Sequence, residues 1–121
     1  MLTDHVGLKV KDLNISKNFY RENLDFEEVS THENERVNIV FMKNENTVIE
    51  LVCDKKGEYG QVPNGIVSHI AFTVPDIKYY IEKLKENNIK FEMDEPMVMG
   101  NKLIIFFPGP DGERLEFVQY K

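Results

Sequence analysis

Two short stretches of the chain alternate large apolar residues with small or polar ones. In residues 5–10 the apolar positions are 6, 8 and 10, and in residues 69–74 they are 70, 72 and 74. This period of two predicts a strand with one face on a core. His5 and Lys9 therefore point the same way, away from the apolar face. His69 opens the second stretch as His5 opens the first.

The order of these features recurs in both halves of the chain. The spacing between His5 and His69 equals the spacing between Asp12 and Asp76, which follow shortly after the two stretches. The sequence around Glu50 also returns in the second half, so that each half carries a Glu near its end. Recurrence of several features in register predicts one supersecondary unit used twice.

The first unit is expected to be a β-α-β-β-β arrangement. A helix over 13–23 follows Asp12, which is a plausible N-cap. The predicted strands cover residues 6–10, 24–31, 37–42 and 47–53, with polar turns at 32–36 and 43–46. His32 falls in the first of these turns and is therefore interpreted as a solvated loop residue.

The second unit repeats this order. Its helix begins after Asp76, has apolar residues at spacings of three and four, and ends at Asn87 and Asn88. Strands are predicted over 67–74, 89–93, 102–107 and 113–120, with a loop over 94–101. The predicted fold class is α+β, one domain over residues 1–121 built from two tandem βαβββ modules. Module 1 covers about 1–53, a linker about 54–65, and module 2 about 66–121.

Composition limits the classes of function. A hydrophobic share of 41% and a charged share of 30% fit a globular protein, and we expect a cytoplasmic location because neither a signal pattern nor a membrane-length apolar run occurs. The net charge of −6 and the lack of a basic cluster weigh against nucleic acid. The single cysteine, Cys53, excludes an internal disulfide.

A glutamate stands in the middle of the last apolar strand in the first unit and again in the second. Strands disfavour Glu, and burying a carboxylate is costly unless it is paired or binds a metal. Glu50 and Glu116 are expected on the strand face that carries His5 or His69 in the same unit. Two imidazoles and two carboxylates suit a divalent metal such as Ni, Co, Mn, Fe or Zn. The alternative is that both pairs lie on the solvated face of a sheet.

Across nearly its whole length the sequence resembles the vicinal oxygen chelate superfamily, also called the glyoxalase/bleomycin-resistance/dioxygenase family. The segments that carry the resemblance are residues 5–12, 19–26, 48–51, 68–74 and 110–117.

Within this superfamily, the ligand order His, Glu, His, Glu resembles that of small bacterial glyoxalase I. The resemblance implies that His5, Glu50, His69 and Glu116 bind one divalent metal per site, with Ni favoured. It also implies paired βαβββ modules whose sheets curl around the metal. A homodimer that builds each site from two chains is implied as well.

The implied reaction converts the adduct of a 2-oxoaldehyde and a thiol into a 2-hydroxyacyl thioester through a metal-stabilised enediolate. Glu116 would act as the base, and Glu50 as a ligand and partner in reprotonation. Lys9 stands where glyoxalase I enzymes usually hold glutathione carboxylates with an Arg, so Lys9 is a candidate contact for a substrate anion. Asp54 stands where they have an Asn, and the thiol is therefore left open.

Two other readings of the same resemblance remain. One is another metalloenzyme of the superfamily: a fosfomycin-type thiol transferase, an epimerase or an Fe(II) dioxygenase. The other is a metal-free protein that sequesters a drug or metabolite, as bleomycin-resistance proteins do. In every case the expected partner is a small molecule, with no nucleic acid and no membrane.

Overall fold

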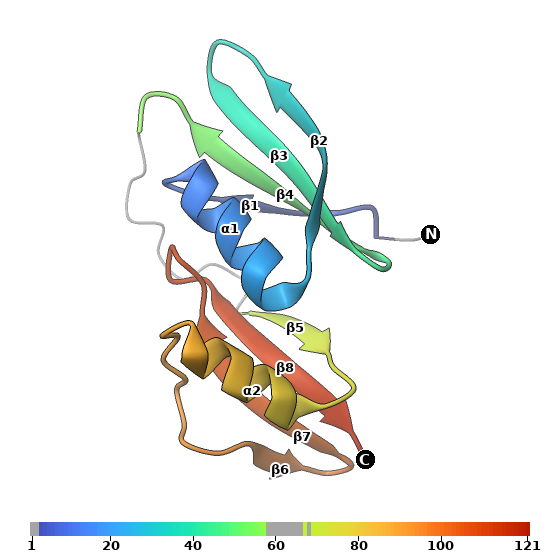
Figure 1. The fold of residues 1–121 in the computed structure, drawn as a ribbon. Coiled ribbons are helices and arrows are strands. Elements are labelled where there is room, and N and C mark those ends of the chain that lie inside the picture. Colours follow the sequence, from blue (N-terminus) through green and yellow to red (C-terminus); the bar gives the residue numbers. More distant parts are fainter. Residues whose placement is uncertain (1–2, 58–66, 68) are drawn as a thin grey trace. The chain divides into compact units, whose positions relative to one another are not determined.

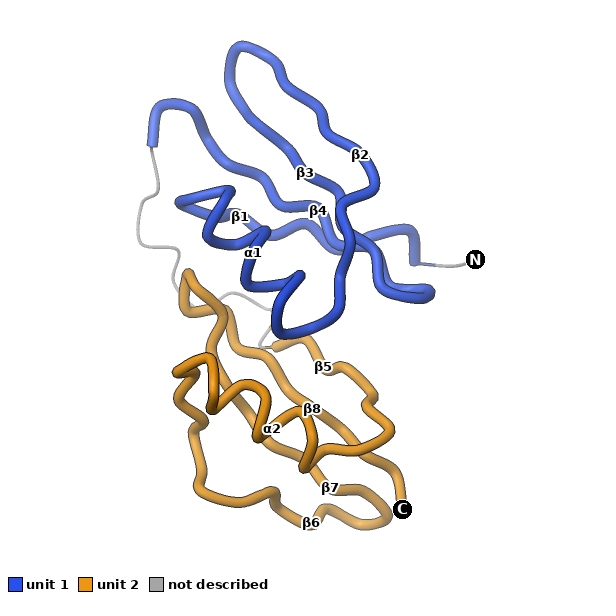
Figure 2. Tube along the Cα trace, viewed as in Figure 1, with its two compact units in different colours: residues 1–63 blue, residues 64–121 orange. Residues whose placement is uncertain are grey.

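The computed structural model describes residues 3–57, 67 and 69–121. The chain divides into two compact units, residues 1–63 and residues 64–121 (Figure 2). Most of the predicted linker, residues 58–65, lies outside the described residues. Each unit is built on the same plan, as the repeat predicts.

In the first unit, one helix lies over a four-stranded mixed sheet (Figure 1). The strand order is β1-β4-β3-β2, with β1 parallel to β4 and the other pairs antiparallel. The elements are β1 (Val6–Lys9), α1 (Leu13–Leu24), β2 (Glu27–Glu33), β3 (Val37–Asn44) and β4 (Thr47–Asp54).

The second unit has the same topology, with the order β5-β8-β7-β6 and with β5 parallel to β8. The elements are β5 (Ile70–Thr73), α2 (Ile77–Glu86), β6 (Met97–Met99), β7 (Lys102–Pro108) and β8 (Arg114–Tyr120). The prediction of two tandem βαβββ modules is confirmed, and the two mixed sheets are separate and do not close into a barrel.

In the first unit, successive side chains of a strand point to opposite faces of the sheet, and one of these faces forms the core. Ile49 and Leu51 of β4 and Met42 of β3 are fully buried, together with Tyr20 of α1. Glu50 lies between the two buried β4 residues and is only partly exposed, because it projects to the opposite face. The core therefore forms between α1 and one side of the sheet, which leaves the other side for Glu50.

The second unit forms its core in the same way. Ile77 and Leu84 of α2 are fully buried, as are Leu115 of β8 and Phe107 of β7. The rings of Phe107 and Phe117 pack with their centroids 4.5 Å apart. Among the helices of the described residues, none is both long and apolar enough to cross a membrane.

The prediction for His32 is wrong in its secondary structure. His32 lies in β2, paired with Ile39 of β3, and its side chain is exposed. The turn is shorter than predicted because the side chain of Asn34 accepts hydrogen bonds from the backbone N–H groups of Arg36 and Val37. The ladder between β2 and β3 therefore continues to Glu33.

Strand β2 also begins later than predicted. Residues 24–26 do not start the strand, because Asp25 adopts a left-handed conformation with φ of 60° and ends α1. The backbone N–H of Phe26 then donates to the carbonyl of Tyr20. Phe26 is buried as part of the helix C-terminus rather than as a strand residue.

The edge of the second sheet differs from the prediction. Residues 89–93 are not a strand, and the predicted loop over 94–101 contains β6, which pairs with β7 from Met97 to Met99. The N–H of Glu92 donates to the carbonyl of Phe106, 3.0 Å away. Residues 89–93 thus run beside β7 without forming a regular ladder.

Asp12 caps α1 by accepting a hydrogen bond from the N–H of Ile15 at 3.0 Å. We expect Asp12→Ala to lower the free energy of unfolding by about 1 kcal/mol, because an N–H at the helix start loses its acceptor. Urea denaturation measures the change. Asp12→Ser keeps an acceptor and is expected to restore most of the loss, so equal destabilisation by both variants would contradict this role.

Candidate functional site

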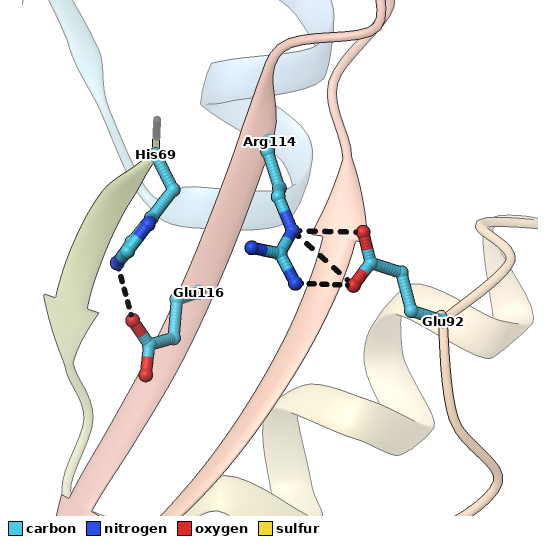
Figure 3. Close-up of polar contacts among 4 residues, drawn as sticks. All are labelled: His69, Glu92, Arg114 and Glu116. Carbon is cyan, nitrogen blue, oxygen red and sulfur yellow. Dashed lines mark hydrogen bonds and ion pairs between the residues drawn. The ribbon is translucent and has the colours of Figure 1, made fainter. Parts of the chain in front are cut away.

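Each unit brings its own His and Glu together on the sheet face that does not form the core. In the parallel strand pairs, Gly7 lies opposite Glu50 and Ala71 lies opposite Glu116. His69 Nε2 is 3.0 Å from Glu116 Oε2 (Figure 3). His5 Nε2 is 4.0 Å from Glu50 Oε1. The structure therefore places His5 with Glu50 and His69 with Glu116, as the shared strand face predicts.

A small residue beside each Glu leaves room for its carboxylate. A Cβ atom at Gly7 would lie 3.2 Å from Glu50 Oε1, closer than ordinary van der Waals contact. Ala71 occupies the matching place beside Glu116. The absence of a larger side chain at these two positions lets each carboxylate extend along the sheet toward the histidine of its unit.

An aromatic ring flanks each histidine. Phe41 and Phe106 lie opposite Glu50 and Glu116 on the neighbouring antiparallel strands. The edge-to-face contacts place the His5 and Phe41 ring centroids 5.7 Å apart and those of His69 and Phe106 5.4 Å apart. Sequence reasoning missed these two rings, although their recurrence at matching positions of the repeat was a usable signal.

A hydrogen bond orients the imidazole of His5. Its Nδ1 lies 2.7 Å from Asp4 Oδ2, and since a carboxylate only accepts, Nδ1–H is the donor. This hydrogen bond raises the pKa of His5 above its usual value, and the charge of Glu50 adds to the effect. The other ring nitrogen, Nε2, is the one that faces Glu50. Asp4 was not among the predicted site residues.

The two carboxylates differ in their exposure. The side chain of Glu116 is 9% exposed, and that of Glu50 is 21% exposed. A carboxylate that has lost most of its water needs a partner that replaces the lost hydration. His69 is such a partner for Glu116, and at 3.0 Å against 4.0 Å the second pair is the tighter of the two.

A second group of side chains lies beside the His69–Glu116 pair and was also missed by sequence reasoning. Arg114 binds Glu92 through two nitrogens, with Nε–Oε1 at 3.0 Å and Nη2–Oε2 at 2.9 Å (Figure 3). The guanidinium carbon of Arg114 lies 3.8 Å from the centre of the Phe106 ring. The hydrogen bond from Arg114 lowers the pKa of Glu92 below its ordinary value of 4.5.

Two further residues from the sequence analysis lie at the edge of the first site. Lys9 is exposed and follows His5 and Gly7 on the same face of β1. Asp54 ends β4, and its Oδ1 accepts a hydrogen bond from the N–H of Lys56 at 2.8 Å. Lys9 thus places a positive charge on the face that carries His5, whereas Asp54 is engaged in a turn of the chain.

Each pair offers one nitrogen and one carboxylate group, which is too few for a complete metal site. Within residues 3–57, 67 and 69–121, no three His, Cys, Asp or Glu side chains gather where they could hold a metal ion. Divalent metals in protein sites take four or more ligands.

Comparison with known proteins identifies the family. Residues 2–117 match the Glyoxalase/Bleomycin resistance protein/Dioxygenase superfamily, and the chain belongs to it. A solved glyoxylase/bleomycin resistance protein/dioxygenase domain from Frankia sp. shares the fold, with a TM-score of 0.85 and 22% identity over all of this chain and 98% of the other.

Several curated proteins align over most of their length. An uncharacterised protein, YwbC of Bacillus subtilis, is 35% identical over 96% of this chain and 95% of its own. The lactoylglutathione lyase of Escherichia coli O157:H7 is 30% identical over 97% of this chain and 91% of its own. The metallothiol transferase FosB of Staphylococcus epidermidis is 27% identical over 93% of this chain and 78% of its own.

The ion pair between Glu92 and Arg114 predicts a pH dependence. Because the pKa of Glu92 is lowered in the folded chain, the ion pair stabilises the fold above pH 4.5, and this stabilisation is lost as the pH falls through the lowered pKa. We expect Glu92→Gln to lower the melting temperature slightly at neutral pH and to have no effect once Glu92 is protonated in the parent chain. The melting temperatures of both proteins, measured from neutral pH down to the pH at which Glu92 is protonated, test this expectation. A difference in melting temperature that does not change with pH would contradict the prediction.

Proposed function

We propose that this protein is a metal-dependent glyoxalase I-like enzyme, which converts the adduct of a 2-oxoaldehyde and a thiol into a 2-hydroxyacyl thioester. The observation that carries the proposal is the same His–Glu pair at the same place in both units, beside the parallel strands. A protein that only encloses a ligand has no need for two such pairs. The similarity to lactoylglutathione lyases supports this choice within the superfamily.

The proposed ligands are His5, Glu50, His69 and Glu116. Imidazole and carboxylate together suit Ni, Co, Zn, Mn or Fe, and the resemblance favours Ni. The bound metal would act as a Lewis acid that stabilises negative charge developing on substrate oxygen. In the first unit, Asp4 accepts a hydrogen bond from the Nδ1–H of His5, so that the Nε2 side remains available to a metal.

Glu116 is the proposed base. The reaction moves one proton from the carbon that bears the thiol to the neighbouring carbonyl carbon, and the hydroxyl proton of the first carbon passes to the oxygen of the second. The carbon that bears the thiol becomes the thioester carbonyl, so this isomerisation needs neither an oxidant nor a reductant. The side chain of Glu116 is nearly buried on β8, where water competes little for the transferred proton. Glu50 is the proposed ligand and partner in reprotonation.

Lys9 is the proposed contact for an anionic group of the substrate, since it lies on the same strand face as His5. A lysine provides charge without the two-pronged geometry of an arginine. Asp54 would repel a carboxylate placed near the end of β4. Lys9 and Asp54 therefore leave the identity of the thiol open, and the test compares several thiols.

We further propose that the chain forms a homodimer in which His5 and Glu50 of one chain and His69 and Glu116 of its partner bind one metal ion. The proposal follows from the resemblance to short bacterial glyoxalase I. A metal site divided in this way would be lost when the dimer dissociates.

The direct test combines metal analysis with activity. We expect the purified dimer to bind one divalent metal ion per chain and to form a lactoyl thioester from methylglyoxal and at least one thiol in a panel that includes glutathione. Chelation should remove the activity, and Ni should restore it. Absence of the thioester with every thiol would reject the isomerase, and tight stoichiometric metal binding by a monomer would reject the divided site.

Glu116→Gln separates proton transfer from metal binding. The amide keeps the size of the side chain but cannot accept the proton, so we expect turnover to fall by about 10²–10⁴-fold, the usual contribution of a general base. Calorimetric titration should show that much of the metal affinity remains. A Gln variant with normal turnover would remove Glu116 from the base role.

A thiol transferase of the fosfomycin type is the second candidate. The observation in its favour is the alignment with FosB, a metallothiol transferase, over 93% of this chain. The same metal-loaded protein distinguishes the two reactions, since a transferase would consume thiol in the presence of fosfomycin and would not form a thioester from methylglyoxal.

A further inference from the structure

Glu92, Phe106 and Arg114 form a closed set of contacts beside the His69–Glu116 pair, which we call the Glu92–Arg114 clamp. The backbone N–H of Glu92 donates to the carbonyl of Phe106 at 3.0 Å. The Glu92 carboxylate binds the Arg114 guanidinium through two nitrogens. The guanidinium in turn lies over the ring of Phe106 at 3.8 Å. Glu92 is therefore attached to Phe106 both directly and through Arg114.

Through Phe106 the clamp contacts His69, a proposed metal ligand. The Phe106 ring touches His69 edge to face, with the ring planes at 89°. One face of Phe106 is covered by Arg114, so rotation of the ring would break the stacking contact. Because Phe106 pairs with Glu116 across the sheet, the same strand position also borders the carboxylate of the pair.

The chemistry of the clamp fits a positioning role better than an anion-binding role. Glu92 uses the Nε and Nη2 edge of Arg114 and compensates its charge, which leaves little attraction for a substrate anion. Exposed ion pairs of this kind also contribute little to overall stability. The ion pair instead holds the planar guanidinium of Arg114 over the ring of Phe106.

The first unit provides an internal comparison. Phe41 has the same edge-to-face contact with His5, but Val48 occupies the place that Arg114 has in the repeat. Valine has neither the charge nor the planar group needed to stack on the ring. The His–Glu distance is 4.0 Å in that unit and 3.0 Å in the unit with the clamp.

We propose that Glu92 and Arg114 are positioning residues that hold Phe106, and through it His69, in the orientation that meets Glu116. The orientation of His69 is claimed for the protein without a bound metal. Its consequence for metal binding rests on the proposed function. The clamp would pre-organise His69 and Glu116, so that these two ligands have their binding geometry before a metal binds.

The test uses full-length variants and the ring signals of the three histidines in NMR spectra of the metal-free protein. Replacing each histidine in turn assigns its signals. Glu92→Gln removes the charged acceptor, and Arg114→Lys keeps the charge but loses the fork and the planar stack. Both are expected to move the His69 signals while those of His5 stay in place. Glu33→Gln is the matched control, because it breaks the exposed Lys55–Glu33 ion pair of the first unit.

Metal titration supplies the second measurement. With Ni²⁺ or Zn²⁺, we expect Glu92→Gln to weaken binding about tenfold, the lower end of the cost of removing support from a metal-binding histidine. Glu33→Gln is expected to bind like the parent protein. Circular dichroism spectra and melts establish that all variants are folded.

Each outcome decides one part of the proposal. Unchanged His69 signals in both clamp variants, or equal movement of His5 and His69, would overturn the positioning role. Displaced His69 signals with metal affinity equal to that of the Glu33→Gln control would overturn its link to metal binding. If the parent protein binds no metal, the proposed function fails, and the NMR comparison still decides the clamp.

Discussion

The pairing of a parallel edge strand with the last strand of each unit is the constraint on which the site depends. This pairing sets Gly7 beside Glu50 and Ala71 beside Glu116, and so brings a histidine from the start of the unit to a glutamate from its end. A parallel pair needs a crossover connection, which the helix provides. The helix also covers the core face, so that the side chains of the His–Glu pair occupy the other face.

A glutamate between apolar residues is unfavourable in a strand, and the structure shows which groups surround each carboxylate. Gly7 leaves space for the carboxylate of Glu50, the small residue Ala71 lies opposite Glu116, and each imidazole gives its carboxylate a partner. The same groups that accommodate the carboxylates also aim imidazole nitrogen at carboxylate oxygen, which is the combination that divalent metals accept.

Duplication has produced two related but unequal pairs. In the first unit, His5 is held from outside by Asp4, an exposed neighbour in the chain. In the second unit, His69 is held by Phe106, which Arg114 covers. The two pairs therefore share their place in the fold but differ in the groups that hold the imidazole.

The sequence by itself determined the two βαβββ units, the helix starts at Asp12 and Asp76, and the shared face of each His–Glu pair. These follow from periodicity and capping, which are properties of neighbouring residues, and from the repeat, which can be read by comparing two segments of the sequence. Only the tertiary structure decided that His32 belongs to β2, that β6 rather than residues 89–93 pairs along β7, and that Glu92 meets Arg114. The physical reason is that these contacts depend on lateral hydrogen bonds and on stacking between residues distant in the chain. These contacts depend on strand register, and a local pattern of hydrophobic and polar residues does not predict that register.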